Sequence, residues 1–272
     1  MTILAILIGL LISHYATGVR HFRRFEPLLA PARWAHRTWP QPSWLVMLVM
    51  ILTCLLAAGL AEWVLVGLAG TLGWFVLALF VFIYCLGPRD LDKDVQLLLE
   101  CGPDSADPEV ARTLRSMRLQ PDSDAQAASA AVHHAALSRW FGLFFWFVVL
   151  GIPGALLYRL VRAGLQGSFD AESSDWLARL RLVLDWPVLV LVVLSAGLCS
   201  DLDRVIDTWR DQPEGSMMWG VTPDLLDRVA GIALEPGASV SDGLASAHRL
   251  VWRMLILWLV VMSLILIAGW MV

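Results

Sequence analysis

The stretch that decides the fold is Arg139–Arg162, RWFGLFFWFVVLGIPGALLYRLVR. From Trp140 to Tyr158 it carries no charged residue, and an arginine stands at each end. It is therefore long and apolar enough to cross or enter a bilayer core. Pro153, within Gly151-Ile-Pro-Gly154, removes a backbone donor, and lipid tolerates such a break only where neighbouring helices satisfy the freed carbonyls. We expect a broken membrane helix inside a bundle.

The composition of the whole chain also indicates a membrane protein. Of its 272 residues, 58% are hydrophobic and 14 are Trp, which is unusual for a soluble domain. The formal net charge of −4 shows no basic excess, so nucleic acid is not an expected partner. The four cysteines include no CxxC pair, so neither a disulfide nor a metal site is predicted.

Other apolar segments predict further membrane helices. Thr2–Val19 is the first, and the arginines that follow it predict a cytoplasmic loop and a periplasmic N-terminus. Trp44–Leu60 and Val64–Leu86 predict a hairpin that turns at Ala61-Glu62-Trp63. Met254–Val272 predicts a last membrane helix. The segment between the first helix and Trp44 is expected to be a short basic loop.

The region after Arg162 leaves two topologies open. In the first, both Arg139–Arg162 and Val188–Cys199 cross the membrane fully, which places the four arginines of the connection between them outside, against the positive-inside rule. In the second, the two apolar segments enter and return as re-entrant or interfacial helices. Breaks at Pro153 and Pro187 are consistent with this alternative.

Two polar regions separate the membrane segments and predict short helices. The first region predicts helices over residues 89–100, 108–117 and 125–138, and the second over 201–210 and 225–234. The simplest topology places both regions in the cytoplasm, where we expect them to pack on each other. The predicted fold is all-α and polytopic, with four to six transmembrane or re-entrant helices. Its expected divisions are residues 1–88, 89–138, 139–200, 201–249 and 250–272.

Sequence motifs of familiar catalytic and metal sites are absent, so no catalytic residue, metal or cofactor is predicted, and a non-enzymatic role is favoured. Asp185 is of interest because a carboxylate in an apolar run is costly unless it is paired, and Arg159 or Arg181 can pair with it. A structural ion pair is the simpler interpretation, and a substrate or proton site the alternative. The same two interpretations apply to His14, near the end of the first segment: a structural role is the simpler one, and a substrate or proton site is the alternative.

Two charged patterns receive simple interpretations. Arg20, Arg23 and Arg24 can contact phosphate groups or anionic lipid, although their role in setting topology explains them without a ligand. The acidic rows Asp90–Asp94 and Asp201–Asp207 are interpreted as solvated helix faces.

Three stretches carry a resemblance to a known family. They are FIYCLGPRDLDKDV (82–95), RWFGLFFWFVVLGIPGALLYRLVRAG (139–164) and LDWPVLVLVVLSAGL (184–198). In this order and spacing they resemble the AmpE family, inner-membrane proteins linked to the regulation of β-lactamase induction. The second stretch also resembles the related CobD/CbiB membrane proteins of cobalamin biosynthesis.

The two branches differ in polar residues. CobD/CbiB proteins carry an ENTVDG-like stretch before the aromatic block and a GRDT-like stretch upstream, whereas this chain has HHAALSRWFG (133–142) and SMRLQPDSDAQ (116–126). The residues that the resemblance assigns to ATP-dependent amide formation are missing, which favours the AmpE branch. That branch implies a regulatory role in cell-wall recycling.

We therefore predict a multi-pass protein of the bacterial inner membrane that modulates β-lactamase induction. Its expected partners are the lipid bilayer and a protein or cell-wall-derived ligand. The alternative is a membrane enzyme of the cobalamin-biosynthesis type, similar to adenosylcobinamide-phosphate synthases, or one acting on a cell-wall-derived substrate. A transporter is a third possibility, suggested by the broken helices.

Overall fold

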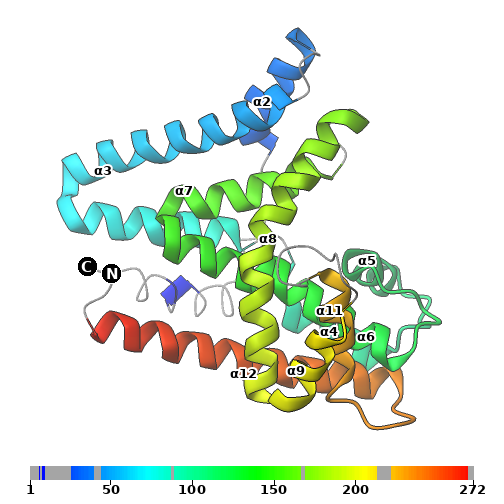
Figure 1. Cartoon of the computed structure of the whole chain (residues 1–272). Coiled ribbons are helices and arrows are strands. Elements are labelled where there is room, and N and C mark those ends of the chain that lie inside the picture. Colours follow the sequence, from blue (N-terminus) through cyan, green and yellow to red (C-terminus); the bar gives the residue numbers. More distant parts are fainter. Residues whose placement is uncertain are drawn as a thin grey trace. The chain divides into compact units, whose positions relative to one another are not determined.

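The computed structural model describes residues 6, 8–9, 26–39, 44–86, 89–166, 169–212 and 222–268. All regular structure in these ranges is helical, which confirms the all-α prediction (Figure 1). Four helices in the same ranges are long and apolar enough to cross a membrane: Trp44–Cys85, Ala125–Gly164, Ala171–Cys199 and Val240–Ile265. The chain is a multi-pass membrane protein. Most of the predicted first segment, Thr2–Val19, lies outside the described residues.

The chain folds as two compact units. Unit 1 comprises Met1–Pro88 and Gly142–Asp185, and unit 2 comprises Arg89–Phe141 and Trp186–Val272. Unit 1 contains α2 (Glu26–Thr38), α3 (Trp44–Cys85), α7 (Gly142–Gly164) and the first half of α8 (Ala171–Cys199). The second half of the basic loop expected before Trp44 forms helix α2, because this segment has an apolar face that packs on α3. This face is formed by Leu29, Ala32 and Ala35.

Helix α3 reverses direction at Gly70, where φ is 57° and ψ is −138°. The predicted turn at Ala61-Glu62-Trp63 is therefore wrong, because these three residues continue the helix. Figure 1 shows the two legs of α3 folding back on each other. The first leg, residues 44–69, is about 39 Å long at about 1.5 Å per residue, enough to cross a bilayer core of about 30 Å.

Helix α7 reverses in the same way at Gly151, where φ is 67° and ψ is −146°. In each hairpin another glycine follows three residues later. A Cβ on Gly73 would lie 2.1 Å from the Leu65 carbonyl oxygen, and one on Gly154 would lie 2.3 Å from that of Trp146. Both hairpins therefore use a Gly-x-x-Gly turn in which the first glycine supplies the positive φ and the second allows the legs to touch.

The two hairpins pack against each other within unit 1. Phe82 of α3 lies 5.5 Å from Phe144 and 5.1 Å from Phe147 of α7, between ring centroids. Gly142, at the start of α7, lies against the hydroxyl of Tyr158 near its end. Helix α7 therefore folds back on itself at Gly151 instead of running straight.

Helix α8 runs without interruption from Ala171 to Cys199, with Pro187 inside it. The prediction of a helix break at Pro187 is therefore wrong. A proline removes one backbone donor, and the helix continues because the apolar run after it is packed. Its buried residues there include Val188, Leu189, Val192 and Val193.

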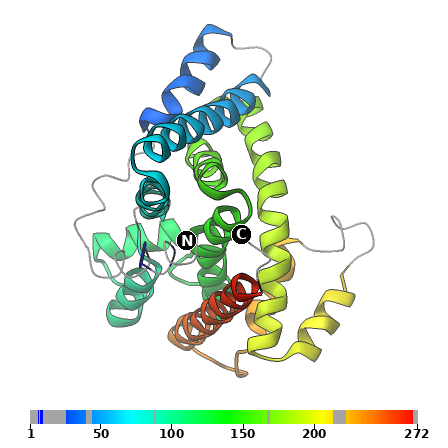
Figure 2. The same cartoon turned by 90° about the vertical axis from the view of Figure 1, so that its left-hand side faces the viewer.

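Unit 2 holds the polar helices and the last membrane helix. They are α4 (Leu91–Cys101), α5 (Pro108–Met117), α6 (Ala125–Ala136), η2 (Leu137–Phe141), α9 (Leu202–Arg210), α11 (Pro223–Gly231) and α12 (Val240–Ile267). Helix α6 packs on α11 and α12, and the Ser129 hydroxyl donates to the Ala230 carbonyl at 2.7 Å. The two polar regions therefore pack on each other, as expected (Figure 2).

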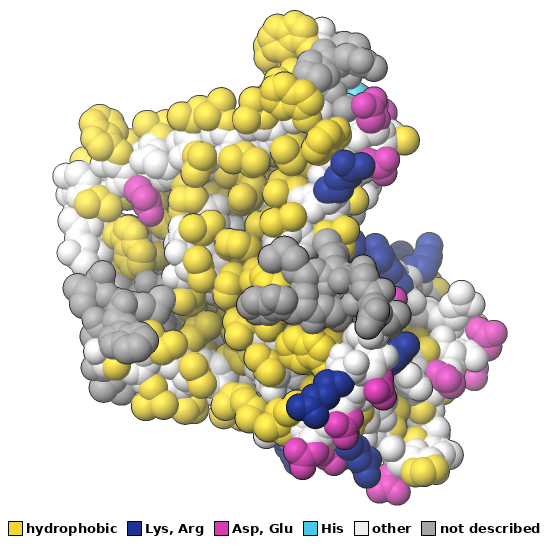
Figure 3. Space-filling view, in the orientation of Figure 1, with side chains coloured by type: hydrophobic (Ala, Val, Ile, Leu, Met, Phe, Trp, Pro, Cys, Tyr) yellow, Lys and Arg dark blue, Asp and Glu magenta, His cyan; other side chains and the backbone are white. Residues whose placement is uncertain are grey.

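The surface of α3 is strongly apolar. Large side chains that are more than half exposed include Leu55, Leu56, Leu60, Trp63, Leu68 and Leu72. Hydrophobic side chains dominate this part of the surface in Figure 3. An apolar surface of this extent marks contact with lipid or another partner, and the length of the helix identifies lipid as its natural solvent.

Candidate functional site

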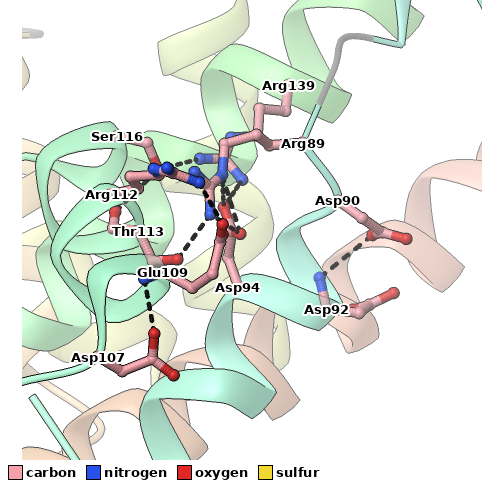
Figure 4. Close-up of polar contacts among 10 residues, drawn as sticks. All are labelled: Arg89, Asp90, Asp92, Asp94, Asp107, Glu109, Arg112, Thr113, Ser116 and Arg139. Carbon is pink, nitrogen blue, oxygen red and sulfur yellow. Dashed lines mark hydrogen bonds and ion pairs between the residues drawn. The ribbon is translucent and has the colours of Figure 1, made fainter. Parts of the chain in front are cut away.

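A cluster of polar side chains in unit 2 surrounds Asp94, on the first turns of α4 (Figure 4). The side chain of Asp94 is only 7% exposed. The interpretation of Asp90–Asp94 as a solvated face is therefore wrong for this residue. Asp94 shares the buried face of α4 with Leu91, Val95 and Leu98, and α5 and α6 pack against that helix.

Two arginines bind the Asp94 carboxylate from opposite ends of the first polar region. The Nε and Nη2 atoms of Arg89 donate to Oδ1 at 3.1 and 2.9 Å. Nη1 of Arg139 donates to Oδ2 at 2.8 Å. Two guanidinium groups on one carboxylate leave a formal net charge of +1.

Hydroxyl groups from α5 accept hydrogen bonds from the same arginines. Thr113 Oγ1 accepts from Nη2 of Arg89 at 2.6 Å, and Ser116 Oγ accepts from Nη2 of Arg139 at 3.2 Å. Thr113 is fully buried. We call Arg89, Asp94, Thr113, Ser116 and Arg139 the Asp94 site. Its arginines are held on two sides, so their orientation is fixed before any ligand binds.

Arg139 reaches the site from η2, a π-helical turn between α6 and α7. Such turns are rare and occur frequently at functional sites. Arg89 is 29% exposed and Arg139 is 11% exposed. Because guanidinium groups bind carboxylate and phosphate through two parallel hydrogen bonds, the remaining N–H groups are suited to an anionic ligand.

The other acids of the row have different partners. Asp90 caps α4, accepting from the backbone N–H of Asp92 at 3.3 Å. Oδ1 of Asp92 accepts from Nε1 of Trp252 at 2.9 Å and lies 2.7 Å from Nε2 of His248, both on α12. Trp252 in turn contacts Trp140, with ring centroids 5.7 Å apart. These contacts attach α4 and η2 to α12 within unit 2.

Asp185, the acid singled out by the sequence, lies in unit 1 and is paired. Both its oxygens accept from Nη2 of Arg162 at 2.9 Å, and Oδ1 accepts from the Tyr158 hydroxyl at 2.9 Å. Nε of Arg181 lies 3.5 Å from Oδ2. We call Tyr158, Arg162, Arg181 and Asp185 the Asp185 cluster.

The expected pairing with Arg181 is present, and Tyr158 and Arg162 are partners that the sequence analysis did not name. Tyr158 and Arg162 are four residues apart on α7, as are Arg181 and Asp185 on α8, so each pair shares a helix face. This four-residue spacing is the feature of the sequence that could have indicated these pairs. Arg159 lies next to Tyr158 on α7 and is partly exposed.

The remaining candidates lie elsewhere. His14, Arg20, Arg23 and Arg24 fall outside the described residues. Among the residues that the structure describes, no group of three His, Cys, Asp or Glu side chains is placed to hold a metal ion.

One comparison with known proteins gives a relative. The chain is 30% identical over 165 residues to the cobalamin biosynthesis protein CobD of Stutzerimonas stutzeri, a match that covers 56% of this chain and 54% of that protein. The chain therefore spans about half the length of this curated relative. No protein-family model and no solved structure matches the chain. This distant similarity is to a cobalamin biosynthesis protein.

Proposed function

We propose that this chain is a membrane protein of the cobalamin-biosynthesis type that binds a phosphate-bearing substrate at the Asp94 site. The observation that carries the proposal is its similarity to CobD, together with the predicted multi-pass character that the structure bears out. The alternative function weighed from the sequence is thus preferred to the regulatory one.

The Asp94 site supplies the chemistry that phosphate recognition requires. Arg89 and Arg139 provide planar donors and a net positive charge, and Asp94 fixes the separation of the two guanidinium groups. Thr113 and Ser116 hold the same groups from α5, which limits their freedom to rotate. A preorganised arginine pair loses little side-chain entropy on binding.

The proposal is tested by ligand binding to the full chain in lipid nanodiscs. ATP and cobinamide are titrated separately against the wild type and the Arg139→Gln variant. Loss of one charge-assisted contact is expected to weaken binding of the phosphate-bearing ligand by about tenfold or more, or about 1.4 kcal/mol.

The matched control is Arg112→Gln. Arg112 is on α5, beside the site, but its side chain is 61% exposed and pairs with Glu109. Wild-type binding that is retained in Arg112→Gln and lost in Arg139→Gln supports the proposal. Failure of the wild type to bind ATP, or equal weakening of ATP binding in both variants, contradicts it.

A specific observation keeps a regulatory function as second candidate. The stretch His133-His134-Ala-Ala occupies the place of the ENTVDG-like segment, and its polar groups serve the packing of α6. His133 is 1% exposed with Nδ1 on the Ser129 carbonyl, and His134 lies 2.6 Å from Asp227 of α11. A deletion strain distinguishes the candidates: impaired cobalamin-dependent growth supports the first, and altered β-lactamase induction with normal growth supports the second.

A further inference from the structure

The Asp185 cluster contains more hydrogen-bond donors than its single carboxylate can satisfy. Arg162 and Tyr158 both donate to Asp185, and Arg181 adds a second positive charge at 3.5 Å. Two arginines and one aspartate leave a formal net charge of +1. The hydroxyl of Tyr158 increases the excess, because toward Asp185 it acts as a donor.

Two buried N–H groups in the cluster make no hydrogen bond. Nε of Arg162 and Nε of Arg181 are both shielded from solvent, and Nε of Arg181 has only the 3.5 Å ion-pair contact with Asp185. An unpaired donor of a charged group in an apolar environment is destabilising, and so is an uncompensated positive charge. Both deficits are removed by one additional anionic oxygen ligand.

The position of the cluster along α8 indicates where that ligand comes from. Residues 186–199, after Asp185, contain no charged side chain, whereas charged residues recur through residues 171–185. The Arg179 guanidinium stacks on Trp176 at 5.1 Å from the ring centroid. Tryptophan and arginine are typical of the level at which lipid headgroups meet the apolar core. The cluster therefore lies at the depth of phosphate groups.

We propose that the Asp185 cluster binds a phosphate group at the membrane surface, with Arg162 and Arg181 as its ligands. Phosphate suits the site because arginine binds it through paired N–H donors and because its charge balances the excess of +1. Asp185 and Tyr158 position the two arginines. This site lies in unit 1 and is independent of the function proposed for the Asp94 site.

Two sources of the phosphate are separated by one experiment on the full chain. Thermal unfolding is followed in detergent micelles after addition of phosphatidylglycerol, of phosphatidylcholine, or of inorganic phosphate. In the wild type, the midpoint temperature of unfolding is expected to rise by several degrees when phosphatidylglycerol is added. A comparable rise with inorganic phosphate instead would assign the site to a soluble phosphate compound, and either response supports a phosphate site.

The variants decide whether the response belongs to this cluster. We expect at least half of this rise in midpoint temperature to be lost in Arg162→Gln and in Arg181→Gln. The control is Arg179→Gln, which should keep the full rise because Arg179 is exposed and stacks on Trp176. Arg181→Gln is included because Nε of Arg181 makes no hydrogen bond in the fold, so that variant is expected to fold even if Arg162→Gln does not. No rise in the wild type, or an equal rise in wild type and Arg181→Gln, overturns the proposal.

Discussion

The Asp94 site and the Asp185 cluster use the same residue types in opposite ways. Each holds one aspartate between two arginines, and each includes hydroxyl groups. At Asp94, Thr113 and Ser116 accept hydrogen bonds from the arginines, whereas at Asp185 the Tyr158 hydroxyl donates to the carboxylate. At Asp94 the hydroxyls accept from some of the arginine donors, whereas at Asp185 the hydroxyl adds one more donor.

This difference underlies the assignment of a soluble phosphate-bearing substrate to the Asp94 site and of a phosphate group at the membrane surface to the Asp185 cluster. The Asp94 site is built from polar helices, and its arginines are oriented by neighbouring hydroxyls. The Asp185 cluster lies on membrane helices and retains two buried N–H groups that make no hydrogen bond. The following substitutions test the contrast through the free energy of unfolding in detergent, from the largest expected effect to the smallest.

Asp185→Asn is expected to destabilise the protein most, by about 3 kcal/mol. It removes the charge that compensates Arg162 and Arg181, and removal of one partner from a buried ion pair typically costs several kcal/mol. Asp175→Asn, at an exposed position of the same helix, is the control and should change stability little. A loss of unfolding free energy no larger than that of Asp94→Asn would contradict the proposed difference between the two clusters.

Asp94→Asn is expected to destabilise by about 2 kcal/mol. The charge is lost here as well, but Thr113 and Ser116 still accept hydrogen bonds from Arg89 and Arg139, and Arg89 is partly exposed to solvent. Asp104→Asn, at an exposed position between α4 and α5, provides the comparison. Chemical unfolding of the two variants side by side measures the difference.

Thr113→Val is expected to cost about 1 kcal/mol. The substitution keeps the side-chain volume and removes the acceptor of the Arg89 N–H, which leaves a donor without its partner in a buried setting. Unfolding of this variant unchanged from wild type would show that the α5 hydroxyl does not stabilise the arginine.

Tyr158→Phe is expected to have the smallest effect, about 0.5 kcal/mol. It removes one hydrogen-bond donor from a cluster that has more donors than acceptors, and Asp185 keeps its two hydrogen bonds from Arg162. A loss clearly greater than that of Thr113→Val would reverse the proposed roles of the hydroxyls in the two clusters.

The sequence predicted those elements that local signals define. Helix α5 has the predicted bounds Pro108–Met117, because Asp107 accepts from the backbone N–H of Glu109 and proline suits the first turn. The turn at Gly70 was missed because glycines in an apolar run resemble helix interior, and Glu62 offered a false polar signal. Comparing LAGTLG (68–73) with VLGIPG (149–154) would have indicated two similar turns.

The two clusters differ in how far the sequence reveals them. Asp185 stands out as an acid in an apolar run, and helical spacing indicates its partner Arg181. Its contact with Arg162 joins α7 to α8 and depends on tertiary packing. Asp94 lies in a charged row, and its burial depends on α5 and α6 packing over α4, a tertiary effect that helical periodicity alone does not contain. The Asp94 site was therefore found only in the structure.

The most direct test of the account is native mass spectrometry of the full chain released from nanodiscs that contain phosphatidylglycerol, in the presence of ATP and cobinamide. Wild type, Arg139→Gln and Arg181→Gln are compared for retained ligand and retained lipid. The account predicts that Arg139→Gln loses the soluble ligand but keeps the lipid, and that Arg181→Gln does the reverse. Loss of both by either variant, or of neither by both, would contradict the assignment of separate roles to the two clusters.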